Sequence, residues 1–103
     1  AVVGWSVTGP ARDEDLDVGS HELYAIYLRP ECVGRGQGRA LMQHCIADLA
    51  GRGFAEIVMW VLRGNERAQR FYGKAGFVAD ERIPPEEVGE TGALKLRMWR
   101  RLG

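Results

Sequence analysis

The fold is decided by the stretch ELYAIYLRPECVGRGQGRAL, which covers residues 22–41. Its first part, Glu22–Leu28, is a nearly continuous apolar and aromatic run, which is typical of a central strand covered on both faces. Arg29-Pro30 ends this strand. A glycine-dense loop follows and leads into apolar residues at helical spacing. The stretch therefore predicts a buried strand, a loop and the start of a helix.

The helix is predicted over Gly38–Arg52, with Gly51 or Gly53 at its end. Its apolar positions repeat with the period of a helix and are Leu41, Met42, Cys45, Ile46 and Leu49. A second buried strand, Glu56–Leu62 (EIVMWVL), comes next. A strand, helix and strand in this order predict a right-handed crossover between two parallel strands.

On the amino-terminal side, the valine-rich segment Ala1–Thr8 predicts a strand that Gly9-Pro10 ends. The charged stretch Arg12–Asp17 has too few apolar residues to bury, so it is predicted to be a solvated loop. The flanking strands should form antiparallel edges. We therefore expect an α/β (α+β) domain with a mixed, mostly antiparallel sheet, a central parallel strand pair and two flanking helices.

On the carboxyl-terminal side, a short helix is predicted over Asn65–Lys74, with Asn65 as its N-cap and Gly76 just past its end. Three further elements are predicted: a strand at Phe77–Arg82, a loop at Ile83–Gly92 and a strand at Ala93–Arg100. In the last strand, Leu94, Leu96 and Met98 alternate with Lys95, Arg97 and Trp99, which predicts one wet face.

The composition narrows the function. The chain has 103 residues, so we expect one domain, and its formal net charge of zero argues against a nucleic-acid partner. No apolar run is long enough to cross a bilayer, so no membrane association is expected. Cys32 and Cys45 lack metal-type spacing and are too few for a secreted disulfide framework. We expect reduced thiols and a cytoplasmic protein.

The loop before the first helix is a predicted anion site. Glycines let the backbone approach a ligand, the helix start directs N–H groups outward, and Arg35 and Arg39 add positive charge. Neither the Walker pattern nor the dinucleotide fingerprint G-x-G-x-x-G fits. The pattern R-x-x-G-x-A does fit, with Arg35, Gly38 and Ala40. Taken alone, the same six residues could form a glycine-rich turn without a ligand.

A second match extends this pattern: Asn65-x-x-Ala68-x-x-Phe71-Tyr72, followed by Gly76-Phe77. Together with residues 22–41, it resembles the GNAT superfamily of acetyl-CoA-dependent N-acetyltransferases, over roughly residues 1–100. The family domain normally begins with a further strand, two helices and a strand. These have no counterpart before residue 1, so we expect the acetyl-CoA-binding part without that amino-terminal part.

The resemblance implies roles for individual residues. The CoA pyrophosphate would be held by backbone N–H groups of the loop, and the backbone of Tyr27 and Leu28 would pair with pantetheine and the acetyl carbonyl. The loop residues concerned are Val33, Gly34, Arg35, Gly36, Gln37, Gly38, Arg39 and Ala40. Asn65 would contact the cofactor in addition to capping its helix.

Tyr72 is the predicted general acid and also a cofactor contact. Its phenol, with a pKa near 10, is well matched to a CoA thiolate with a pKa of roughly 8.5. Without the resemblance, Tyr72 would be interpreted as a half-buried aromatic residue. Glu22 is the candidate general base and has an equally simple alternative, a glutamate at a strand edge facing solvent. His21 and His44 qualify only because histidine titrates in the right range.

These predictions describe acetyl transfer from acetyl-CoA to a primary amine of a small molecule or protein, with no metal. The alternatives are a non-catalytic acyl-CoA-binding or assembly module and an unrelated α/β domain with a glycine turn. The residues that would select the amine lie outside the chain and in Ile83–Gly92. Because the family often dimerises and the first strand has an open edge, a homodimer is a further expectation.

Overall fold

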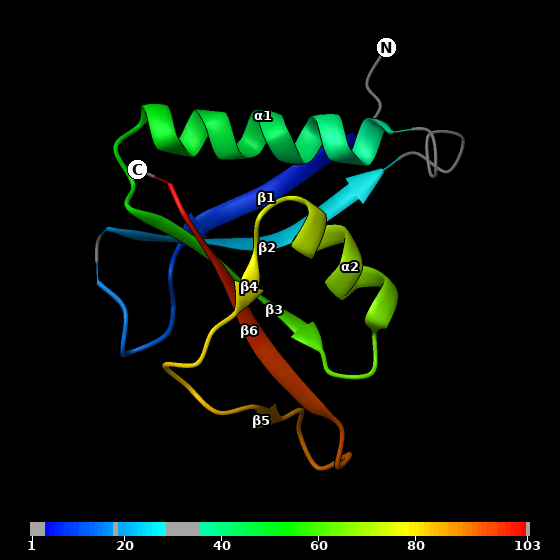
Figure 1. Ribbon diagram of the computed structural model, residues 1–103. Coiled ribbons are helices and arrows are strands. Elements are labelled where there is room, and N and C mark those ends of the chain that lie inside the picture. Colours follow the sequence, from blue (N-terminus) through cyan, green and yellow to red (C-terminus); the bar gives the residue numbers. More distant parts are fainter. Residues whose placement is uncertain (1–3, 18, 29–35, 103) are drawn as a thin grey trace.

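The computed structural model describes residues 4–17, 19–28 and 36–102. For residues 4–7 and 25–28 it describes the backbone only. Within these residues the chain forms six strands and two helices (Figure 1). In chain order they are β1 (Gly4–Pro10), β2 (Ser20–Leu28), α1 (Gln37–Gly51), β3 (Glu56–Leu62), α2 (Glu66–Lys74), β4 (Val78–Ala79), β5 (Glu86–Glu87) and β6 (Leu94–Arg101).

The strands form one sheet in the order β1-β2-β3-β6-β4, and β5 also pairs with β6. Of the described pairs, β2 and β3 run parallel, and the others are antiparallel. The predicted fold class is therefore confirmed, including the parallel pair joined by the helix now seen as α1. The strand predicted at Glu56–Leu62 has the same bounds in the structure.

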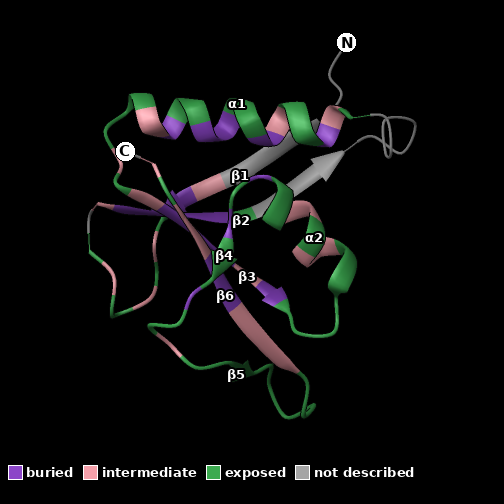
Figure 2. Cartoon of the chain, viewed as in Figure 1, coloured by how far each residue is buried: buried purple, intermediate pink, exposed green. Residues whose placement is uncertain are grey.

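Both helices pack on the same face of the sheet through one apolar cluster. Residues at every second position of β3, namely Ile57, Met59 and Val61, belong to this cluster. The α1 members of the cluster are Met42, Cys45, Ile46 and Leu49. From α2, the partly buried residues Ala68, Phe71 and Tyr72 pack against the cluster. In Figure 2 the buried residues of α1 face the strands and its exposed residues face outward. The apolar period predicted from the sequence is the one that is buried.

The opposite face of the sheet departs from the prediction. Arg97 was expected on a wet face of its strand, but it is 1% exposed. The stretch Arg12–Asp17 is a largely exposed loop, as predicted, but it also supplies Asp13 and Asp15 as partners of Arg97, at 3.0 and 2.6 Å. The prediction for Arg97 is wrong because a buried charge is stabilised by partners distant in sequence, which a local pattern does not reveal.

The element ends also differ from the predictions in part. β1 includes Gly9 and Pro10, which pair with Glu22 and His21, and it ends at Pro10, so the predicted stop is confirmed although the strand is two residues longer than expected. Among the described strands β1 lies at an edge, where proline lacks only an N–H that no neighbour needs. A Cβ at position 9 would lie 2.7 Å from a ring carbon of Tyr24, so the close approach of β1 to the Tyr24 ring favours glycine at this position.

Near the carboxyl terminus, two predictions change in extent. The strand predicted over Phe77–Arg82 shrinks to the two residues of β4, because its chain turns at Asp80 toward the buried arginine. The loop predicted over Ile83–Gly92 contains the two-residue strand β5, which pairs with Lys95 and Leu94. Both short strands add to the β6 ladder without changing the order of the longer strands.

Candidate active site

The central feature of the site is the divergence of β2 and β3. Their parallel ladder has three registered pairs and ends at Glu22 with Val58. Beyond it, β2 continues to Leu28 while paired with β1 on its other side. Within the described strands, the edge of β2 from Leu23 onward therefore has no strand partner on the β3 side. Figure 1 shows the two arrowheads pointing apart. Backbone N–H and C=O groups along this edge are available to a ligand.

The amino end of α1 lies at the same end of the sheet as the carboxyl end of β2 (Figure 1). Gly36 precedes the helix with a φ of 83°, a left-handed conformation that glycine adopts without strain. Gly38 is buried in the first turn, whereas Arg39 and Ala40 are exposed. The positive end of the helix dipole and the guanidinium of Arg39 both favour an anion here. The predicted contacts Val33, Gly34 and Arg35 lie outside the described residues.

For Tyr27 and Leu28, the structure describes the backbone only. They pair with Trp5 and Gly4 of β1 and lie on the part of β2 that has left β3. Their predicted backbone contacts with a ligand would therefore use the edge turned toward β3. Gln37 begins α1 and is partly buried.

The short helix α2 brings Tyr72 to the helix-covered face of the sheet. The Tyr72 ring packs edge-on against Phe71 and Phe77, with centroid separations of 5.3 and 5.9 Å. Burial raises the pKa of Tyr72 above its usual value. The phenol is therefore protonated at neutral pH, as a general acid must be. No hydrogen bond to its hydroxyl oxygen occurs among the residues that the structure describes.

Asn65 caps α2, as the sequence predicted. Its side-chain oxygen accepts a hydrogen bond from the Ala68 N–H at 3.1 Å. Asn65 is exposed at the start of α2, three residues after the end of β3. This leaves its amide nitrogen directed to no described partner, so a contact with a ligand is compatible with the cap.

Glu22 lies in the last registered pair before β2 and β3 separate. It is 3% exposed, so the alternative of a solvent-facing glutamate is wrong. Both carboxylate oxygens accept hydrogen bonds from Arg12: Oε1 from the backbone N–H at 3.1 Å and Oε2 from the guanidinium at 2.9 Å. This ion pair raises the pKa of Arg12. Any amine that uses Glu22 must share it with Arg12.

Tyr72 and Glu22 lie on opposite faces of the sheet. Side chains alternate along a strand, and Leu23, the neighbour of Glu22, belongs to the apolar cluster beneath the helices. Glu22 therefore points to the other face, where Arg12 lies. A reaction that uses both groups would have to occur at the gap between the strands.

The polar network of Asp13, Asp15, Asp80, Arg82 and Arg97 was missed at the sequence level. Arg97 donates to the Asp80 carboxylate at 2.8 Å, and Arg82 donates to the same carboxylate at 2.7 Å. Burial alone would raise the pKa of Asp80, but hydrogen bonds from Arg82 and Arg97 outweigh it and lower the pKa to about 2. Trp60 Nε1 also donates to Asp13 at 3.0 Å. The network fixes the segment that contains Arg12, and so indirectly the partner of Glu22.

One sequence signal pointed weakly to this network. Trp99 lies on the same face of β6 as Arg97, and a tryptophan on a face predicted to be wet is unusual. In the structure the Arg82 guanidinium lies over the Trp99 ring, 4.7 Å from its centroid. The aspartate partners carried no such signal.

The described part of the chain contains neither a cluster of metal ligands nor a membrane-spanning helix. No group of three or more histidine, cysteine, aspartate or glutamate side chains there could hold a metal ion. Neither described helix has the length and apolar character needed to cross a membrane. His44, the weaker candidate base on α1, is exposed.

Comparison with known proteins identifies the family. The model of the acetyltransferase (GNAT) family matches residues 1–77. An uncharacterized N-acetyltransferase of Mycobacterium tuberculosis is 40% identical over 76 residues, which are 74% of this chain and 46% of the relative. The chain therefore belongs to the GNAT family of acetyltransferases, and it spans about half the length of the curated relatives it matches.

Solved structures agree on the fold. Ard1 from Thermoplasma volcanium superposes with a TM-score of 0.81 at 21% identity, covering 100% of this chain and 65% of that one. A chain of the NatC complex bound to Gag peptide and CoA has a TM-score of 0.78 at 14% identity, covering 98% and 62%. At these identities the likeness supports the fold alone.

Proposed function

We infer that this chain is the acetyl-CoA-binding domain of an N-acetyltransferase that acetylates a primary amine. The observation that carries the proposal is the opening between β2 and β3, which has an unpaired strand edge beside the amino end of α1. This combination offers donors for a thioester carbonyl and an anion site for a pyrophosphate. Membership of the acetyltransferase family supports the same chemistry.

Acetyl-CoA would bind with its pyrophosphate on the backbone of residues 33–40 and with Arg39 as a nearby cation. Its pantetheine arm would then run along the open edge of β2, where Tyr27 and Leu28 present their backbone. The NatC chain with this fold was solved with CoA, which supports the choice of cofactor. Asn65 would contact the cofactor from the start of α2. The direct transfer proposed here requires no metal.

In the reaction, the neutral amine attacks the thioester carbonyl carbon, and a tetrahedral intermediate forms with negative charge on oxygen. A backbone N–H at the open edge of β2 would stabilise that charge. The intermediate collapses as the C–S bond breaks and Tyr72 donates its proton to the departing thiolate; the proton that the attacking nitrogen then loses would restore the Tyr72 phenol, directly or through water. Because burial keeps the Tyr72 phenol protonated, the acid is in the required form at neutral pH.

The acceptor would approach from the face that holds Glu22. An ammonium must lose a proton before it attacks, and Glu22 would take that proton directly or through water. The buried carboxylate already holds the Arg12 guanidinium, so a cationic amine fits the charge of this position. Glu22→Gln should therefore lower the rate most at a pH at which the acceptor amine is protonated. The proposed acceptor is a primary amine of a small molecule or protein.

The decisive experiment is a calorimetric titration with acetyl-CoA, followed by CoA-thiol release assays with a panel of amines. Tyr72→Phe should lower kcat by about a hundredfold and leave acetyl-CoA affinity nearly unchanged. Tyr24→Phe is the matched control, because it removes a phenol hydroxyl that instead donates to the Pro10 carbonyl. An equal loss of acetyl-CoA binding in Tyr72→Phe would contradict the acid role.

The same assays separate the competing functions. Saturable acetyl-CoA binding without turnover of any amine would favour an acyl-CoA-binding or assembly module. Absence of CoA binding would favour an α/β domain whose glycine loop is only a turn. We further propose a cytoplasmic location, supported by the few, non-metal-type cysteines, and a homodimer paired through β1, which lies at an edge of the described sheet.

A further inference from the structure

A second pocket lies at the opposite end of α1 from the proposed cofactor site. It has a volume of about 660 Å³ and is formed where the end of β1, the start of β2 and the end of α1 meet. Helix α1 has 15 residues, so at 1.5 Å per residue its two ends lie about 22 Å apart. The pocket is therefore separate from the opening between β2 and β3.

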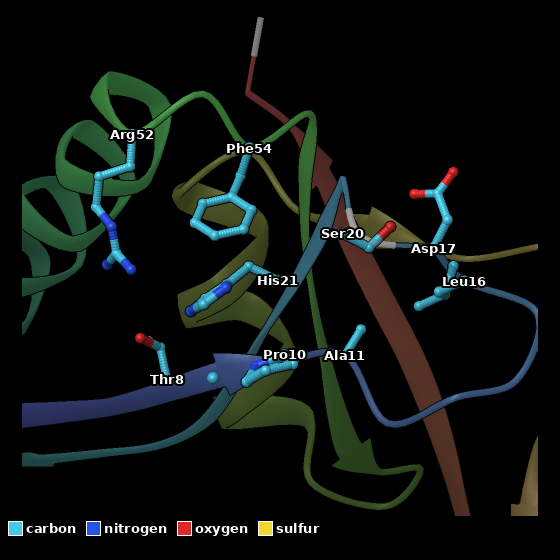
Figure 3. Close-up of a pocket in the computed structure, with 10 residues that line it drawn as sticks. Thr8, Pro10, Ala11, Leu16, Asp17, Ser20, His21, Arg52 and Phe54 are labelled. Atoms are coloured by element: carbon cyan, nitrogen blue, oxygen red, sulfur yellow. The ribbon is translucent and has the colours of Figure 1, made fainter.

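A buried imidazole points to a ligand in this pocket. His21 is 5% exposed, and its Nδ1 has no hydrogen-bond partner, the sole such buried side-chain atom in the described part of the chain. Buried polar atoms are nearly always paired, so an unpaired one requires an explanation. Figure 3 shows the His21 ring between Phe54 and Thr8, with its nitrogen atoms toward the hollow. The ring centroid lies 4.3 Å from that of Phe54, which fixes its orientation.

Arg52 adds a positive charge to the same space. Its guanidinium extends from the end of α1 toward the His21 ring in Figure 3 and lies 5.4 Å from the Phe54 ring centroid. Burial, and then the charge of Arg52, lower the pKa of His21, which agrees with their proximity. The described partner of Arg52 is Asp48 at 3.3 Å, in an exposed pair one helical turn apart that contributes little and can be exchanged.

The remaining walls indicate the size and charge of the ligand. Pro10, Ala11 and Leu16 provide apolar surface, and Thr8 provides a hydroxyl. Asp17 also lines the pocket, with its Oδ1 accepting the Gly19 N–H at 2.9 Å. Its negative charge, together with that of Asp48, disfavours a ligand with more than one anionic group.

We propose that this pocket binds a small monocarboxylate with an apolar body. The carboxylate would accept hydrogen bonds from the Arg52 guanidinium and the His21 imidazole, and the apolar part would lie against Pro10 and Leu16. A neutral imidazole carries its proton on one ring nitrogen, which serves as a donor. Two donors that converge over an apolar wall select a carboxylate over a neutral amide of the same shape.

The test uses the full chain, with benzoate and butyrate as probes and benzamide and butyramide as uncharged counterparts. Backbone amide NMR shifts should saturate with the carboxylates at residues 8, 9, 11, 21 and 52–54, and the amides should bind at least about tenfold more weakly. Arg52→Gln should weaken carboxylate binding by a similar factor. Arg101→Gln, at an exposed arginine on β6, should leave it unchanged.

His21→Phe separates a ligand role from a structural one. It keeps a ring against Phe54 and removes the unpaired nitrogen, so the melting temperature should stay the same or rise while benzoate binding falls. Acetyl-CoA affinity should not change in either variant, so this test fails or succeeds independently of the proposed function. Equal binding of amides, equal loss in Arg101→Gln, or no saturation by either carboxylate would overturn the proposal.

Discussion

One face of the sheet is covered by α1 and α2 through apolar side chains, whereas the other face buries Arg97 among three aspartates. The apolar face is stabilised by burial, and no side chain there depends on one specific partner. On the charged face each group depends on the others, because a buried charge without a partner is strongly destabilising. Tyr72 lies on the apolar face and Glu22 on the charged face. The proposed reaction therefore uses one group from each environment.

The strongest way to test this contrast is to remove Arg97. Arg97→Ala should lower the free energy of unfolding by about 4 kcal/mol, because it leaves Asp80 buried with only Arg82 as partner. Urea denaturation would measure the change. Arg101→Ala, at an exposed position on the same strand, should cost less than about 0.5 kcal/mol. Similar losses in the two variants would mean that the polar network does not stabilise the fold.

The apolar face can be tested with one truncation on α1. Leu49 is 1% exposed, and Leu49→Ala should cost about 3 kcal/mol through lost burial and a residual cavity. Leu62→Ala on β3 is the matched control, since Leu62 is 49% exposed. The free energies of unfolding of both variants would come from denaturation at neutral pH and again at high salt. The Leu49 loss should not depend on salt; a salt-dependent loss would contradict a purely apolar contact.

Acid should distinguish the two faces without any mutation. The folded-state pKa of Asp80, about 2, lies below the ordinary value of 3.8 expected for the unfolded chain. Its contribution to stability is therefore complete above pH 3.8 and is lost as the pH falls through about 2. That contribution is about 2 kcal/mol at neutral pH. The free energy of unfolding should be measured between pH 5 and 2, roughly the window in which the carboxyl titrates. It should fall more with acid in the wild type than in Asp80→Asn.

The smallest expected effect concerns the end of α2 nearest the opening. Asn65→Ala should cost about 1 kcal/mol through loss of the N-cap to Ala68, whereas Asn65→Ser should keep most of the stability. If Asn65 also contacts acetyl-CoA, the serine variant should still lose affinity in a calorimetric titration. Unchanged affinity in the serine variant would restrict Asn65 to its capping role.

Much of the apolar face could be predicted from the sequence. The period of Met42, Cys45, Ile46 and Leu49 is a local property of the chain, and it gave the helix and its buried side. The same holds for β3 and for the Asn65 cap, since caps and buried strands depend on residues close in sequence. The order of these elements then implied the parallel pair of β2 and β3.

The charged face could not be predicted in the same way. Arg97 and Asp13 are 84 positions apart, and only the folded sheet brings them within 3.0 Å. An alternating strand pattern shows that Arg97 and Leu96 face opposite sides, but it does not show that both sides are buried. The burial of Glu22 could not be predicted for the same reason, because its partner Arg12 belongs to a loop ten residues away in the sequence.

By itself, the sequence determined the family and the order of the elements, because these depend on short motifs and local periods. The tertiary structure decided where β2 and β3 separate, which side of the sheet Glu22 occupies and how Arg97 is neutralised. It also revealed the pocket at His21, which no motif marked. Each of these depends on atoms that are distant along the chain and meet only when the sheet is assembled.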